Sequence, residues 1–164
     1  MSTVSAETLN VNACDVVFNM SQPHEVSMPR SQIYRNDTHV SEIDMINISS
    51  TKGFVIMTII RSNQTNQLSF ADSIRAADND IWRADTPINT IEIDDKNGWY
   101  MINYINNIPV YTIMYYIQNP SEANYISSPN CNETTICSLI ISTLPIYDTA
   151  DFLRSLHIGS TRVA

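Results

Sequence analysis

Two carboxylates near the middle of the chain are the residues best suited to acid–base chemistry. Glu92 and Asp94 lie two positions apart in a segment with strand character, so their side chains are expected on one face of the strand. Two carboxylates on one face can serve as general acid and general base. Charged residues on a half-exposed strand also suppress pairing between sheet edges, and this explains the same pattern.

The other candidates for catalysis or metal binding are scattered along the chain. His24, His39 and His157 have no second His or Cys at the spacing of metal ligands. Asp78 and Asp80 begin a run that resembles a calcium loop, but its sixth and twelfth positions lack the Gly and Glu of an EF-hand. Only three glycines are present, and no phosphate loop or Gly-x-Ser-x-Gly elbow is found. We therefore expect no metal, no cofactor and no catalytic residue.

Cysteine supplies a candidate cross-link. Cys131 and Cys137 are separated by five residues, a loop short enough for a disulfide if the two side chains converge. Two free, buried thiols explain the pair equally well, because Cys packs as a small hydrophobic residue. Cys14 would then be the unpaired third cysteine.

The composition favours an extracellular or cell-surface protein, with a cytoplasmic protein as the alternative. The formal net charge is -8, which argues against nucleic acid as a partner. Only 16% of residues are charged and only Lys52 and Lys96 are lysines, so neutral polar residues supply the solubility. An AT-rich genome would produce the same bias towards Asn and Ile. Three Asn-x-Ser/Thr sequons in loop-like stretches are candidate glycosylation sites: Asn36, Asn63 and Asn132. Two further sequons, at Asn19 and Asn47, are weaker candidates, and Asn47 is expected in a strand.

No segment is suited to spanning a membrane. The longest uninterrupted apolar run, residues 54–57, is far short of the roughly 20 residues that a bilayer requires.

Period-two alternation and β-branched residues predict a chain dominated by strands. Two helices are also expected: residues 70–83, with Phe70, Ile74, Ala77 and Ile81 on one face, and a C-terminal helix capped by Asp148 that ends near His157. The sequence of residues 95–98, Asp-Lys-Asn-Gly, predicts a hairpin turn. The predicted strands cover residues 15–20, 24–28, 43–49, 53–61, 88–94, 99–105, 110–118 and 136–143.

This order predicts an α+β fold, in which a single antiparallel β-sheet is packed with helices. We expect a flexible N-terminal segment at residues 1–14 and a single α+β domain at residues 15–164.

Tyrosines are concentrated in two of the predicted strands. Tyr100 and Tyr104 face opposite to Trp99, and Tyr111 and Tyr115 face opposite to Tyr116, because strand side chains alternate. If the set Tyr100, Tyr104, Tyr111 and Tyr115 is exposed, it forms a candidate binding face for a protein or a glycan. Packing in the core is the other interpretation.

The order of elements resembles the fold shared by the PsbP extrinsic proteins of photosystem II and the Ran-binding Mog-type proteins. The apolar strand at residues 53–60, the helix and hairpins after it, and the segment at 140–145 leading into 148–158 carry this resemblance. It implies a PsbP/Mog-like sandwich that binds partner proteins rather than a catalyst.

Two functions follow from these observations. We expect a non-catalytic exported or cell-surface binding or accessory domain whose partner is an unknown protein or glycan. The alternative is a small hydrolase or metal-dependent enzyme with a site assembled from Glu92, Asp94 and a loop histidine. A deep pocket lined by these groups would favour the enzyme, and a tyrosine-lined face would favour binding.

Overall fold

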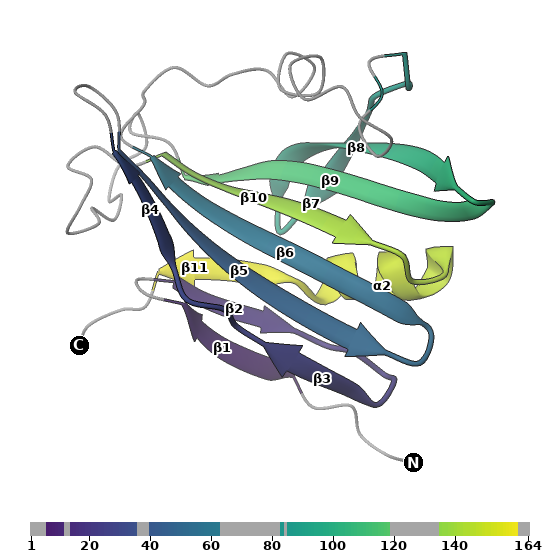
Figure 1. The fold of residues 1–164 in the computed structure, drawn as a ribbon, viewed down its shortest axis with the longest axis horizontal. Coiled ribbons are helices and arrows are strands. Elements are labelled where there is room, and N and C mark those ends of the chain that lie inside the picture. The colour runs from purple at the N-terminus through teal and green to yellow at the C-terminus, as the bar shows by residue number, and fades with distance from the viewer. Residues whose placement is uncertain are drawn as a thin grey trace.

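The computed structural model describes residues 6–11, 14–35, 40–62, 83, 85–118 and 135–160. In these segments the chain forms two antiparallel sheets and one helix, with the helix beside the start of the last strand (Figure 1). The described strands are β1 (Glu7–Val11), β2 (Cys14–Phe18), β3 (His24–Ser27), β4 (Gln32–Arg35), β5 (Val40–Ser50), β6 (Gly53–Ser62), β7 (Asn89–Ile93), β8 (Lys96–Ile105), β9 (Ile108–Gln118), β10 (Thr135–Ser142) and β11 (His157–Ser160), and the helix is α2 (Ile146–Ser155).

The larger sheet has eight strands in the order β3-β5-β6-β10-β9-β8-β7. The eighth strand, β4, pairs with the same edge of β5 as β3 does, because β5 is long enough for both. Seven of the predicted strands are confirmed here, as β3 and β5 to β10. The alternation predicted for β5 is also confirmed, since Asp44, Ile46 and Ile48 are buried while Met45 is exposed.

The prediction of a single sheet packed with helices is wrong. A second sheet of three strands, in the order β1-β2-β11, packs against the larger one. Residues 7–11, assigned from the sequence to a flexible segment, form β1, and His157, expected at the end of a helix, begins β11. The predicted helix at residues 70–83 lies outside the described residues.

The hairpin between β7 and β8 turns two positions earlier than predicted, at residues 93–96 instead of 95–98. Asp94 and Asp95 form the turn with φ of 53° and 59°, while Asn97 and Gly98 lie within β8. A Cβ on Gly98 would lie 2.8 Å from the main-chain oxygen of Met114. The glycine is therefore needed for close packing against β9, and the two aspartates adopt the left-handed conformation that the turn requires.

The core lies between the two sheets. The inner faces of β5 and β6 contribute Ile46, Ile48, Val55 and Met57, all fully buried, and the small sheet contributes apolar residues from β2 and β11. At the edge of α2, the rings of Phe18 and Phe152 are 5.4 Å apart. The face of the large sheet that meets the small sheet and α2 is called the inner face below.

Candidate functional site

A cavity of about 850 Å³ lies between α2 and the inner face of the large sheet. We call it the α2 groove. Its floor consists of alternate residues of β8 and β9, namely Tyr100 and Ile102 with Tyr111 and Ile113. The volume falls within the range of roughly 300–1,000 Å³ that is typical of ligand-binding pockets.

The helix forms one wall of the groove. Ile146, Ala150 and Leu153 turn towards the cavity, whereas Phe152, on the other side of the helix, packs against Phe18. The helix has no side-chain N-cap, and Asp148, the cap predicted from the sequence, lies in its first turn.

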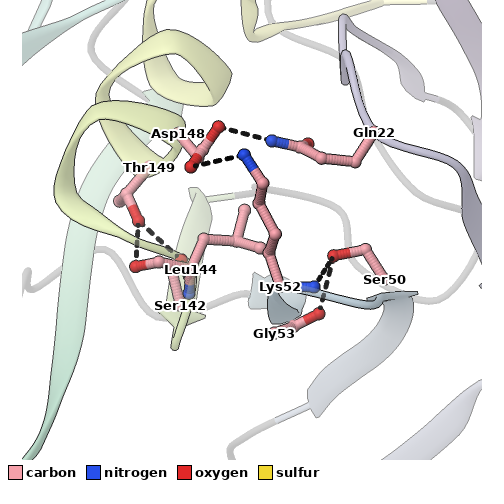
Figure 2. Close-up of polar contacts among 8 residues, drawn as sticks. All are labelled: Gln22, Ser50, Lys52, Gly53, Ser142, Leu144, Asp148 and Thr149. Atoms are coloured by element: carbon pink, nitrogen blue, oxygen red, sulfur yellow. Dashed lines mark hydrogen bonds and ion pairs between the residues drawn. The ribbon is translucent and has the colours of Figure 1, made fainter.

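A chain of hydrogen bonds fixes the start of α2 to the end of β10 (Figure 2). The Thr149 hydroxyl donates to the Leu144 carbonyl oxygen (3.1 Å) and lies 2.9 Å from the Ser142 hydroxyl. The Leu144 N–H in turn donates to the Ser142 oxygen (3.2 Å). Ser142 and Thr149 are buried, so these bonds satisfy polar groups that would otherwise be costly inside the protein.

Asp148 ties the same helical turn to two other segments. Its carboxylate accepts a hydrogen bond from the Gln22 side chain and lies 3.6 Å from the Lys52 ammonium (Figure 2). Lys52 belongs to the β5–β6 turn, where the Ser50 hydroxyl accepts from the Lys52 N–H and donates to the Gly53 carbonyl. The helix wall is thus held in place from the β2–β3 connection and from the β5–β6 turn.

The opposite wall is the edge of the large sheet. Six consecutive residues, from Thr90 through Asp95, line the groove there. The side chains of Ile91 and Ile93 point inward, and the exposed side chains of Thr90 and Glu92 point to the opposite face. The polar edge and the apolar floor together give the groove two chemically different sides.

One end of the groove is acidic. The His157 Nδ1 lies 2.7 Å from an Asp94 carboxylate oxygen, and the other oxygen accepts a long hydrogen bond of 3.4 Å from the Ile158 N–H. The imidazole lies over Gly159, since a Cβ there would be 2.9 Å from the His157 Nε2. Asp95 adds an exposed carboxylate nearby.

The structure brings Glu92, Asp94 and His157 to one cavity but does not make Glu92 and Asp94 a pair. Asp94 lies in the turn rather than in the strand, and it reaches β11 instead of the face that carries Glu92. The expectation that both carboxylates share a strand face is therefore wrong, because the left-handed φ of Asp94 ends the alternation. The contact between Asp94 and His157 joins residues 63 positions apart.

The four tyrosines of the candidate binding face all lie on the inner face, in three environments. Tyr100 and Tyr111 line the groove, Tyr104 is 70% exposed near the tip of the β8–β9 hairpin, and Tyr115 is fully buried. The Tyr115 hydroxyl has no hydrogen-bond partner among the described residues. Of the set, Tyr115 is therefore inaccessible to a partner.

Burial also determines the tyrosine acidities. Removal from water raises the pKa of Tyr111, and the nearby Tyr104 raises it by a smaller amount. Burial raises the pKa of Tyr115 more strongly. On the outer face, burial raises the pKa of Tyr116 to about 12. These phenols stay protonated at neutral pH, so Tyr111 offers the groove a hydroxyl rather than a charge.

A second polar cluster is sealed between the sheets. Arg61, 1% exposed, pairs with Asp44 and donates to the main-chain oxygen of Val11 (2.7 Å), and Asp44 also accepts from Ser31. Cys14 is fully buried beside it; burial raises the pKa of this thiol, partly opposed by Arg61. Arg61 thereby links β1 of the small sheet to β5 of the large sheet.

The predicted disulfide and glycosylation sites stay predictions. Cys137 forms no disulfide with another described cysteine, and burial raises the pKa of its half-buried thiol to about 12, but Cys131 lies outside the described residues. Asn36, Asn63 and Asn132, as well as His39, Asp78 and Asp80, also lie outside them. Of the other sequons, Asn19 is exposed and Asn47 lies in β5, as expected.

The described residues contain neither a cluster of metal-ligating side chains nor a helix able to span a membrane. No group of three or more His, Cys, Asp or Glu side chains in those segments is arranged to hold a metal ion. None of the helices that the structure describes has the length and apolar character needed to cross a membrane.

Comparison with known proteins gives no relative for this chain: no family model matches it, and neither a curated protein nor a solved structure is significantly similar. The resemblance to PsbP-like and Mog-type proteins therefore stays a prediction.

Proposed function

We propose that this chain is a non-catalytic binding domain that holds part of a partner in the α2 groove. The observation that supports this function best is the chemistry of the cavity, which has an apolar and aromatic floor, an apolar helix wall and an acidic end. Ligand sites commonly combine such a lining with a few polar groups that fix orientation. The groove also contains Tyr100 and Tyr111, two residues of the face predicted to bind.

A block of the groove tests this proposal. Ala150 is half-buried on the groove side of α2, and Ala150→Phe would place a ring in the cavity. Tyr147→Ala is the matched control, because Tyr147 lies on the same helix, is 81% exposed and does not line the cavity. With the uncharged dye Nile red as probe, we expect binding at one site, a loss of at least about tenfold for A150F and none for Y147A. Equal binding by A150F and the wild type would contradict the proposal.

We also propose that the domain acts outside the cell or at its surface. The small number of charged residues and the sequons support this location. If the protein from its native host carries glycans at Asn36, Asn63 or Asn132, peptide N-glycosidase F will lower its mass. An unchanged mass together with recovery in the cytosolic fraction would favour a cytoplasmic protein.

The contact between Asp94 and His157 supports a second candidate, the hydrolase. A carboxylate that orients an imidazole is a common arrangement for a general base. Against it, Glu92 turns away from this pair, and Asp94 is also engaged by the Ile158 N–H. Hydrolysis of a p-nitrophenyl ester that falls at least about tenfold in His157→Asn would move this candidate to first place.

A further inference from the structure

We infer that the α2 groove takes an extended segment of a partner protein, which adds to β7 as an antiparallel strand and carries a Lys or Arg opposite Glu92. This inference rests on the proposed function and names the chemistry of the partner.

The first support is the pattern of lining residues. On β8 and β9 only every second residue reaches the groove, because the cavity lies over the face of these strands. On β7 each residue from Thr90 to Ile93 reaches it. A wall made by consecutive residues is the edge of a strand, where main-chain groups are accessible.

The second support is the pairing of β7. This strand is the last of the large sheet and pairs with β8 alone among the described residues. Ile93 and Lys96 close a two-residue turn, so they form a hydrogen-bonded pair, as do Ile91 and Gly98 two positions on. The N–H and C=O groups of Thr90 and Glu92 therefore point away from β8, towards the edge that no other described strand covers. Strand addition uses such groups.

The third support is charge. Directly opposed residues of an antiparallel pair place their side chains on the same face, so the partner residue opposite Glu92 lies beside its carboxylate. With Asp95 also exposed nearby, a basic residue is favoured at that position. The same charges oppose pairing of β7 with β7 of a second copy, since each copy would bring its own carboxylates. The alternate side chains of the partner would point inward, next to Ile91 and Ile93 and under Leu153.

A peptide with selective N-methylation tests the inference. The probe is a fluorescein-labelled nonapeptide in which valine alternates with lysine or threonine, so that valines form the inward row. The amides of the lysine and threonine residues should face β7, and the valine amides should face solvent. We expect methylation of the lysine and threonine amides to abolish binding, measured by fluorescence anisotropy, and methylation of the valine amides to leave it within about twofold. The inference would be overturned if both methylated peptides lost binding, if neither did, or if only the peptide with methylated valine amides did.

Variants of the protein give the complementary test. Thr90→Pro removes one edge N–H, and proline is tolerated on an edge strand where that N–H points outward. We expect T90P to bind the unmethylated peptide at least about tenfold more weakly than Thr90→Ala, which keeps the N–H. Glu92→Lys should weaken binding further than Glu92→Gln. If A150F loses Nile red while T90P and T90A bind the peptide equally, the groove binds ligands but not by strand addition, and only this inference fails.

Discussion

The two halves of the inner face are covered in different ways. A three-stranded sheet covers β5 and β6, and the side chains there, such as Met57 and Ile59, are fully buried. Among the described residues, a single helix covers β7 to β9, and a cavity lies beneath it. A helix of about 10 Å diameter covers less of a sheet than three strands spaced about 4.8 Å apart. The width of the covering layer thus separates a sealed half, which carries stability, from an open half that is suited to binding.

Replacement of Arg61 should break the sealed half and have the largest effect. Arg61→Leu leaves the Asp44 carboxylate without its cation in a buried site and removes the donor to the Val11 oxygen. We expect a loss of about 3–5 kcal/mol in the free energy of unfolding, measured with urea. Arg154→Ala is the control, because its ion pair with Asp151 is exposed, and should cost less than about 1 kcal/mol. Similar losses for the two variants would remove the energetic distinction between buried and exposed pairs.

Two neighbours on α2 compare the halves directly. Phe152 packs on Phe18 at the edge of the sealed half, whereas Leu153 faces the groove. Phe152→Ala should cost about 3–5 kcal/mol in unfolding free energy, and Leu153→Ala less than about 2 kcal/mol because one side of the leucine already lacks packed neighbours. A larger cost for L153A would mean that the groove is closed in solution.

The pH dependence of the unfolding free energy tests a contact in the sealed half. His24 of β3 contacts Glu7 of β1, and its pKa is raised by the hydrogen bond to the Gln22 carbonyl and also by Glu7, while burial opposes the rise. The folded state therefore holds the proton more tightly, so this contribution is complete below the unfolded pKa of about 6.5 and is lost as the pH rises through the higher folded value. The difference in unfolding free energy between wild type and His24→Gln should be larger at pH 5.5 than at pH 8.5. A difference that does not vary with pH would contradict this assignment.

Divalent ions should have the smallest effect. A calcium ion bound only to the folded state at a hundredfold excess over its Kd would raise stability by about 2.7 kcal/mol, a shift of several degrees in Tm. At the acidic end of the groove, the Asp94 carboxylate already contacts His157. We therefore expect Tm to differ by less than about one degree between millimolar calcium and excess chelator, and the same for zinc. A larger shift that Asp94→Asn abolishes would place a metal in the open half.

The sequence predicts the large sheet well and the small sheet poorly, for a physical reason. β5 and β6 have ten or more residues with clear period-two alternation, a signal that survives without tertiary context. β11 has four residues, and it is a strand because β2 supplies its hydrogen bonds from the other end of the chain.

The candidate site was predictable only in its parts. Glu92, Asp94, Tyr100 and Tyr111 were singled out by residue type, and all four line the groove. The helix wall and the contact between Asp94 and His157 depend on how α2 and β11 return to the sheet. No local pattern encodes that return.

The pairing of β11 with β2 also bears on synthesis and folding. Gly159 of β11 lies opposite Asp15 of β2. The small sheet is therefore incomplete until β11, the last strand of the described fold, has left the ribosome. Until then β2 has one unpaired edge, and the apolar residues of β5 and β6 lack part of their cover. Contacts between such distant positions slow folding, because a long loop must close before they form. The nascent chain is therefore expected to need protection from aggregation until its final strand docks.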